Sequence, residues 1–236
     1  MTDIKKLCSL FDRYAHDKNR AIAFTEMLDS FLLPFKFCAT KQEQEVHLAQ
    51  LTSQPKQEEL FSFLEELGEC SQHFCDPLGE IFMQEVSKGH NGQFFTPEHI
   101  CDMMAQITAV NIKDGQSVFD PACGSGRMLL AVAKVNRHVV LYGADIDEVC
   151  VKMSVVNMLL QSLDGEITHM NTLTNEFFKG YCAGSTLYNG YYFPWYKQFL
   201  DPVKSSVCQM NQNKSEKSSQ PANIIPPTNM RQGSLF

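Results

Sequence analysis

At residues 118–126 the sequence reads Val-Phe-Asp-Pro-Ala-Cys-Gly-Ser-Gly, and this stretch decides the fold. Its first two residues suit a buried strand, and the apolar run at residues 128–133 continues at helical spacing. Between them, Gly124 and Gly126 permit positive φ and let a ligand approach the backbone closely. The stretch therefore predicts a strand, a tight turn and a helix whose first N–H groups point at a ligand.

A second apolar strand is expected at residues 138–142, and it ends at Gly143-Ala144-Asp145. Asp145 lies about 20 residues beyond the glycine turn, the spacing at which an acidic side chain meets ribose hydroxyls. Asp120, at the carboxyl end of the first strand, falls where open α/β sheets place ligand-binding residues. Together these features predict half of a nucleoside-binding α/β unit.

Three ordered segments resemble the DNA adenine-N6 methyltransferase family, and most closely the modification subunits of type I restriction systems. They are GQFFTP at residues 92–97, DPACGSG at 120–126 and GADID at 143–147. The resemblance implies S-adenosylmethionine (SAM) as the cofactor. It also implies an α/β fold with a Rossmann-like, SAM-dependent methyltransferase sheet. We expect that sheet to be incomplete, because about four strands can be placed where a full sheet of this type has seven.

The resemblance places the nucleoside end of SAM along the second and third strands. Asp145 would hold the ribose, Ile146 would cover one face of the adenine, and Asn171 would lie near the adenine amino group. Two of these residues have ordinary structural alternatives, a core position for Ile146 and a turn for Asn171. Asp147 is expected to cap the helix that follows the second strand.

The methionine end of SAM would lie against Phe94, Phe95 and Thr96 in the GQFFTP segment, as the resemblance implies. Thr96 also suits the N-cap of a helix that begins at Pro97. No metal is expected. The predicted cofactor-binding residues are Phe95, Thr96, Asp120, Ala122, Gly124, Gly126, Asp145, Ile146 and Asn171.

The target-binding half departs from the family pattern. Family members continue with a strand that ends in Asn or Asp, two prolines and an aromatic residue. The Asn side chain and a proline carbonyl accept the hydrogens of the adenine amino group, and the aromatic ring stacks on the flipped base. The nearest match is Asn-Gly-Tyr-Tyr at residues 189–192, without either proline. Asn189 and Tyr192 are the predicted catalytic residues, and an Asn-Gly hairpin turn is the alternative.

The rest of the chain divides by its patterns into a helical start and a polar end. We expect an N-terminal helical domain over residues 1–90, a SAM-binding methyltransferase-like domain over 91–200 and a flexible polar tail over 201–236. Asp76 and Pro77 suit the N-cap and the first turn of a helix, and residues 76–82 resemble the helix that precedes GQFFTP in the family. There, an N-terminal helical domain packs beside the catalytic domain and helps to embrace DNA.

The composition limits which cell compartment and which binding partners we expect for this chain. A formal charge of −7 argues against strong autonomous binding to duplex DNA, which relies on Lys and Arg contacts to phosphates. The nine cysteines are scattered singly, without zinc-type pairs. With no visible signal peptide or membrane span, they fit a reduced cytoplasm.

The leading interpretation is a SAM-dependent DNA adenine-N6 methyltransferase-like protein, impaired where its target motif is degenerate. It would bind DNA weakly alone and act with a specificity subunit or another methyltransferase subunit. The alternative is a catalytically inactive SAM-binding or interaction module that acts with a partner. A third option is methylation of RNA, protein or a small molecule.

The last five residues, Gln232-Gly233-Ser234-Leu235-Phe236, suggest a further partner. They resemble the peptide by which many bacterial DNA-processing proteins dock on the replication sliding clamp. The segment Gln232–Phe236 therefore predicts clamp docking, with a chance pentapeptide as the alternative.

Overall fold

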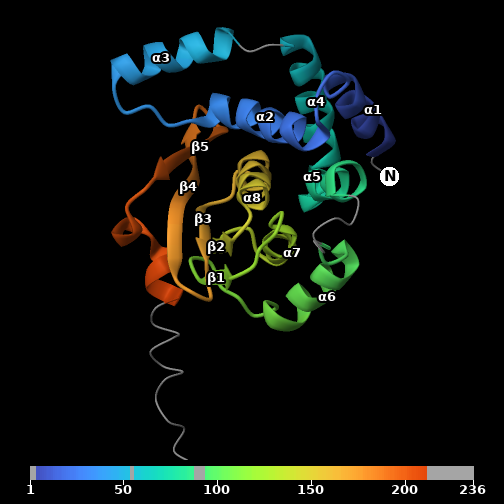
Figure 1. Ribbon diagram of the computed structural model, residues 1–236. Helices are drawn as coiled ribbons and strands as arrows, with labels where there is room; N and C mark the ends of the chain where they lie inside the picture. Colours follow the sequence, from blue (N-terminus) through green and yellow to red (C-terminus); the bar gives the residue numbers. More distant parts are fainter. Residues whose placement is uncertain (1–3, 54–55, 88–93, 212–236) are drawn as a thin grey trace, which may run out of the picture.

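The computed structural model describes residues 4–53, 56–87 and 94–211. Within them, α-helices alternate with strands from β1 to β3, and β4 and β5 follow without a helix between them (Figure 1). The principal elements are α1 (Ile4–Tyr14), α2 (Arg20–Leu32), α3 (Lys41–Thr52), α4 (Gln57–Cys70), α5 (Pro77–Ile81), α6 (Glu98–Thr108), β1 (Ser117–Asp120), α7 (Arg127–Val135), β2 (Val140–Asp145), α8 (Glu148–Leu160), β3 (Gly165–Asn171), β4 (Glu176–Tyr188) and β5 (Tyr191–Phe199).

The described strands form one five-stranded sheet in the order β1-β2-β3-β4-β5. The first three strands are parallel, with Asp120 opposite Gly143 and Asp145 opposite His169. Their carboxyl ends therefore meet at one side of the sheet, which we call the carboxyl edge. The fold is α/β, as predicted, and its glycine turn lies at this edge.

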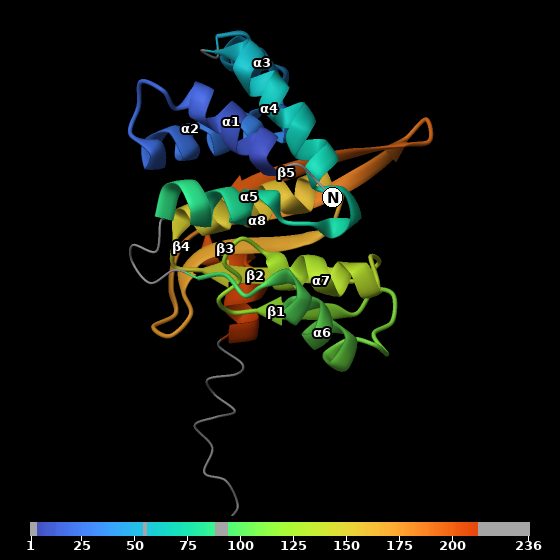
Figure 2. The same cartoon turned by 90° about the vertical axis from the view of Figure 1, so that its right-hand side faces the viewer.

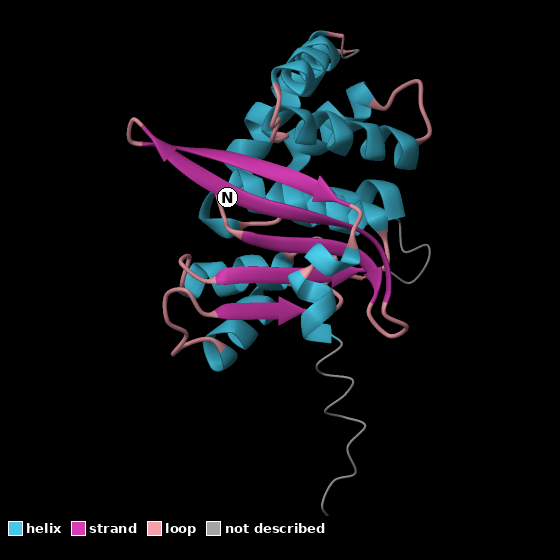
Figure 3. Cartoon of the chain, turned by 90° about the vertical axis from the view of Figure 1, so that its left-hand side faces the viewer, coloured by secondary structure: helices cyan, strands magenta, loops and turns pink. Residues whose placement is uncertain are grey.

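Strands β4 and β5 form an antiparallel hairpin that runs the other way. Since Gly165 at the start of β3 pairs with Ala183, the rest of β4 extends beyond the amino-terminal end of β3. The turn is Asn189-Gly190, both with positive φ (51° and 82°), as a two-residue hairpin loop requires. Figure 3 shows this hairpin projecting past the other strands, and we call residues 184–195 the hairpin arm.

Helices cover the sheet unequally. Helices α7 and α8 pack on one face, and α1, α2, α4 and α5 lie beyond α8, so the N-terminal helices are a further layer on the same side (Figure 2). One hydrophobic cluster runs from Leu7 and Phe11 in α1 to Leu141 and Ile167 in the sheet. The helical region and the sheet therefore share a continuous core.

Residues 201–211 cover part of the other face, which corrects the prediction of a flexible tail from residue 201. Glu166 in β3 is buried and accepts hydrogen bonds from Ser205 Oγ (2.6 Å) and from the backbone N–H of Ser206 (3.0 Å). Val207 and Cys208 are buried beside them. A buried carboxylate thus anchors a segment whose composition alone reads as unfolded. The predicted clamp peptide, at residues 232–236, lies outside the described residues.

Two predicted helix caps have different outcomes. Asp147 caps α8 as predicted, because its side chain accepts hydrogen bonds from the N–H groups of Val149 and Cys150. The Thr96 cap is wrong: α6 begins at Glu98 after Pro97, and no side chain caps it. The Thr96 carbonyl has another partner, described below. Among the described helices, none is both long and apolar enough to cross a membrane.

Candidate functional site

A cavity of about 260 Å³ opens at the carboxyl edge, between the glycine turn and residues 94–97. It lies where β1 ends, so the parallel strands and the segment before α6 both contribute to its wall. The lining residues are Phe94, Phe95, Thr96, Cys101, Met104, Asp120, Ala122, Cys123, Gly124, Ser125, Arg127 and Met128. Five predicted cofactor residues, from two separate sequence segments, are therefore brought together here.

The glycine turn has the geometry that its sequence predicts. Gly124 and Gly126 both have positive φ, 54° and 85°. A Cβ atom at Gly124 would lie 2.9 Å from the ring of Phe95, and one at Gly126 would lie 2.9 Å from Ser154 Oγ. Both positions therefore require glycine, for the backbone angle and for the close approach of a neighbour.

Two carboxylates lie beside this turn. Asp145 accepts hydrogen bonds from the N–H of Gly124 (2.8 Å) and of Asp147 (2.9 Å), while Asp120 accepts one from the N–H of Ala122 (3.1 Å). Burial raises the pKa of both carboxyl groups above its ordinary value, against the lowering effect of these N–H donors. Each carboxylate oxygen keeps lone pairs for a further donor, so Asp145 can still accept from ribose hydroxyls.

The adenine side of the predicted site is formed by the ends of β2 and β3. Ile146 is 57% exposed, so it does not have the core role that was its alternative. His169 lies beside it, with Nε2 3.0 Å from the Ile146 carbonyl oxygen and its ring centroid 4.6 Å from that of Phe178. Sequence reasoning missed His169 and Phe178, since neither belongs to a motif and only strand pairing brings them here.

Asn171 has the local role that was its alternative. Its side-chain oxygen accepts the backbone N–H of Leu173 (3.0 Å) and of Thr174 (3.2 Å), which closes the turn between β3 and β4. The residue does end β3 at the carboxyl edge, as predicted. With its oxygen engaged in the turn, its amide nitrogen is the group left to face a ligand.

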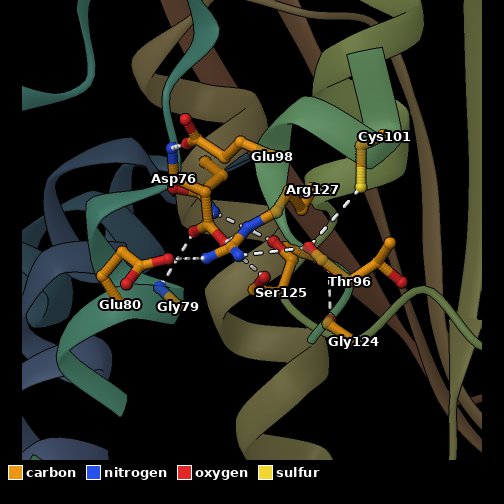
Figure 4. A network of polar contacts seen from close by, with 11 residues as sticks. Asp76, Gly79, Glu80, Thr96, Glu98, Cys101, Gly124, Ser125 and Arg127 are labelled. Atoms are coloured by element: carbon orange, nitrogen blue, oxygen red, sulfur yellow. Dashed lines mark hydrogen bonds and ion pairs between the residues drawn. The ribbon is translucent and has the colours of Figure 1, made fainter. Parts of the chain in front are cut away.

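A network of polar contacts lies behind the cavity wall and links the segments that form it (Figure 4). Arg127, at the start of α7, donates hydrogen bonds to Asp76 (3.0 Å), Glu80 (2.8 Å) and the Thr96 carbonyl (3.2 Å). Asp76 also accepts one from Ser125 Oγ (2.5 Å). The sequence identifies Asp76 only as a helix cap, because its partners lie about fifty residues further along the chain.

The predicted catalytic residues do not reach this cavity. Asn189 and Tyr192 lie at the tip of the hairpin arm, beyond the end of the sheet opposite to the carboxyl edge. The reason is strand direction: β4 is antiparallel to β3, so its own carboxyl end points away from the carboxyl ends of β1–β3. The alternative, an Asn-Gly turn, is what the structure shows, and its neighbouring tyrosines are exposed rather than buried.

Other chemistry at the cavity is limited. Burial raises the pKa of the Cys123 thiol strongly, so it is not a thiolate nucleophile at neutral pH. The described residues contain no group of three or more His, Cys, Asp or Glu side chains that could hold a metal ion. At least four other cavities in the described part of the chain are larger. Those beside α3 and α4 (about 460 Å³) and beside β1 and α6 (about 770 Å³) have no ionisable side chain in their linings. Two smaller ones, of about 290 and 320 Å³, have ionisable side chains in their linings but lie away from the carboxyl edge, beside α1 and α5.

The polar and apolar groups at the carboxyl edge fit the predicted nucleoside cofactor. Asp145 offers acceptors to a ribose, and the exposed Ile146 offers an apolar surface to a base. The cavity beyond the glycine turn offers a second, partly enclosed compartment with Asp120 at its wall. SAM carries a ribose, an adenine and a cationic amino-acid arm, and each part has a matching surface.

Comparison with known proteins adds a family match. A model of the family described as N-6 DNA methylase matches residues 74–199. The chain resembles the type I restriction enzyme MpnII methylase subunit of Mycoplasma pneumoniae, with 31% identity over 142 residues, 53% of this chain and 26% of that protein. It resembles the EcoEI methylase subunit of Escherichia coli, with 30% identity over 115 residues, 42% of this chain and 23% of that protein.

Another relative has a different kind of name. The ribosomal protein L11 methyltransferase of Caldanaerobacter subterraneus is 41% identical over 74 residues, 31% of this chain and 24% of that protein. This chain therefore spans about a quarter, or less, of the length of each of these three relatives.

Two solved structures align with parts of this chain at low sequence identity. A Listeria monocytogenes protein described as a class I SAM-dependent methyltransferase aligns with a TM-score of 0.46 and 18% identity, covering 70% of this chain and 52% of that one. The methyltransferase subunit of a Streptococcus thermophilus type I restriction-modification system aligns with a TM-score of 0.38 and 17% identity, over 72% of this chain and 39% of that one.

Proposed function

We propose a function from the premise that this chain belongs to the N-6 DNA methylase family. The chain binds SAM at the carboxyl edge and provides the cofactor half of a DNA adenine-N6 methyltransferase. One observation carries this proposal: the glycine turn, Asp120 and Asp145 lie together at the edge of a parallel sheet, beside a cavity. This is where open α/β sheets bind nucleotide-like ligands.

Each part of the site has a stated role in the proposal. Asp145 accepts hydrogen bonds from the ribose, and Ile146 covers the adenine. The glycine turn allows the ligand to approach the backbone. Phe95 and Thr96 form the wall against which the methionine arm lies. Asp120 balances the positive charge of that arm. When bound, SAM supplies an electrophilic methyl group, and this chain's residues hold that group in a partly enclosed cavity.

The structure favours a second candidate, a SAM-binding module that is inactive alone and needs a partner subunit. Among the described residues, β1 pairs only with β2, so its other backbone edge has no strand beside it. Among the described residues, the two predicted to bind the target adenine, Asn189 and Tyr192, are at the end of the sheet opposite to the carboxyl edge. A specificity or second methyltransferase subunit is the proposed source of the residues that present the target base.

Calorimetry with SAM tests the shared part of both candidates. We expect binding with a dissociation constant in the micromolar range, which corresponds to about −8 kcal/mol. Asp164→Asn should bind SAM as the unchanged protein does. Asp164, like Asp145, accepts a hydrogen bond from a backbone N–H (Ser185, 3.1 Å), but it lies at the opposite end of the sheet. An absence of heat at millimolar SAM, in protein shown to be folded by circular dichroism, would overturn the proposal.

Radiolabelled methyl transfer separates the two candidates. Unmethylated duplex DNA is incubated with the chain and labelled SAM, with and without a type I specificity subunit. Label in DNA from the chain alone supports a complete enzyme, and label only with the subunit supports the partner-dependent module. Parallel reactions with ribosomal protein and RNA test the third class of substrate, which the L11 methyltransferase match keeps in view.

Clamp docking through Gln232–Phe236 and a cytoplasmic location remain predictions from the sequence. A peptide of residues 226–236 should bind a bacterial sliding clamp, and replacing Leu235 and Phe236 by Ala should remove that binding. Unchanged binding by the doubly substituted peptide would reject a motif-specific contact.

A further inference from the structure

An ionic cluster centred on a buried carboxylate joins the N-terminal helices to the glycine turn (Figure 4). At its centre is Asp76, which precedes α5 and is 1% exposed. Its carboxylate accepts four hydrogen bonds, from the Gly79 N–H (2.9 Å), Ser125 Oγ (2.5 Å), Arg127 Nε (3.0 Å) and Asn157 Nδ2 (2.8 Å). One carboxylate thereby connects α5, the glycine turn, α7 and α8.

The cluster is built for one geometry. A buried carboxylate is costly unless charged or polar partners surround it, and here each oxygen has two donors. Gly79 is required for this approach, because a Cβ atom there would lie 2.1 Å from Asp76 Oδ2 and 2.8 Å from Ser125 Oγ. Residue 79 must therefore lack a side chain, so that Asp76 can reach Ser125 in the glycine turn.

Both walls of the cavity depend on this cluster. On one side, Asp76 holds Ser125, which lies between the two glycines of the turn. On the other side, Arg127 donates to the Thr96 carbonyl, which fixes the segment that carries Phe95. The Asp76 N–H also donates to Glu98 (2.9 Å), the first residue of α6 after that segment.

We propose that Asp76 and Arg127 are positioning residues for the cofactor, and that the N-terminal helices set SAM affinity through them. The inference rests on the proposed function. Asp76 does not need to touch SAM, because four donors surround its carboxylate. Arg127 contributes to the cavity lining, but its guanidinium is engaged by two carboxylates and one carbonyl. They act by keeping the glycine turn and the Thr96 segment apart at the width of the methionine arm.

The methionine arm should therefore feel the loss of Asp76 more than the nucleoside does. The ribose contact is made by Asp145, whose own partners are the N–H groups of Gly124 and Asp147. The Thr96 segment, in contrast, is tied directly to Arg127. A ligand without the amino acid, such as 5′-deoxy-5′-methylthioadenosine, separates these two effects.

The test compares Asp76→Asn with a matched variant, Asp29→Asn. Asp29 in α2 forms an ion pair with Lys152 in α8 (2.6 Å), so it also joins the N-terminal helices to the sheet layer, but without contact to the cavity. Dissociation constants for SAM and for 5′-deoxy-5′-methylthioadenosine are measured by calorimetry, well below the melting temperature of each protein.

We expect Asp76→Asn to weaken SAM binding by about tenfold or more, with less than about a threefold change for 5′-deoxy-5′-methylthioadenosine. Asp29→Asn should leave both constants within about twofold of the parent values. Equal losses for the two ligands would show a merely structural role and overturn the proposal, as would unchanged SAM binding.

Arg127→Lys keeps the test decisive if Asp76→Asn does not fold. Lys retains the charge beside Asp76 but cannot donate to Asp76, Glu80 and Thr96 together. We expect the same selective loss of SAM affinity, and unchanged SAM binding in folded Arg127→Lys would reject the inference. A parent protein that binds neither ligand would instead overturn the proposed function itself.

Discussion

The two ends of the sheet present opposite kinds of surface. At the carboxyl edge, carboxylates, a glycine turn and a buried ionic cluster enclose a cavity. At the other end, the hairpin arm carries no charged residue over residues 184–195 and exposes Leu187, Tyr188, Tyr191, Tyr192 and Phe193. The edge therefore combines polar groups with a cavity, whereas the arm presents exposed aromatic side chains. Resemblance in a short motif therefore has meaning only at the correct end of a strand.

Two glycine substitutions should break the comparison most strongly. Gly124→Ala and Gly190→Ala each force a side chain into positive φ (54° and 82°), at a cost of about 1–2 kcal/mol in stability. Only Gly124→Ala also places a Cβ atom against Phe95, because the space at Gly190 is open. By calorimetry we expect Gly124→Ala to lose more than about 100-fold in SAM affinity, and Gly190→Ala less than about twofold. Equal losses would contradict a cavity confined to the carboxyl edge.

Removing the ribose acceptor should have the next largest effect. Asp145→Ala is expected to weaken SAM binding by about 1.5–3 kcal/mol, because hydrogen bonds to a charged group are lost. Asp164→Ala, at the opposite end, serves as the matched control, since Asp164 also accepts one backbone N–H. Isothermal titration gives both values. A loss of similar size in the two variants would indicate general loosening of the sheet.

Lowering the pH should weaken SAM binding at the carboxyl edge, by less than the substitutions above. Burial raises the pKa of Asp120 and Asp145, so in the free protein both carboxyl groups take up protons at a higher pH than an ordinary carboxyl, about 3.9. The proposed SAM contacts need the ionised forms. SAM affinity should therefore be constant near neutral pH and fall as the pH is lowered, beginning above that ordinary value. Asp145→Asn should show a shallower fall, and an identical pH profile would remove Asp145 from the site.

The smallest effect is expected at the hairpin arm itself. Asn189→Ala and Tyr192→Ala should each change SAM affinity by less than about twofold, because neither residue approaches the cavity. Asn189→Ala should still lower stability by up to about 1 kcal/mol, since Asn suits positive φ in a two-residue turn better than Ala does. Chemical denaturation measures this change in the free energy of unfolding. A large loss of SAM binding in either variant would return the arm to the cofactor site.

Adjacent residues in the sequence predicted the local backbone geometry of the carboxyl edge well. The strand, the glycine turn and the acid at the end of the next strand are local features, and the backbone angles of Gly124 and Gly126 match what their sequence requires. The Asp147 cap was predictable for the same reason, because a cap bonds to N–H groups two or three residues away. The Thr96 cap was wrong because α6 begins at Glu98, so Pro97 occupies the N-cap position and Thr96 lies one residue before it.

What the sequence by itself determined was the alternation of strands, turn and helices that places Asp120 and Asp145 at one edge, because short-range geometry and apolar periodicity suffice for this. Only the tertiary structure decided the rest. Strand direction sent Asn189 to the far end, a buried Glu166 drew residues 201–211 onto the sheet, and burial made Asp76, which also caps α5, the centre of an ionic cluster. The direction of β4 is set by its pairing with β3, and Glu166 and Asp76 depend on side chains 39 or more residues away. Local sequence patterns do not specify such partners.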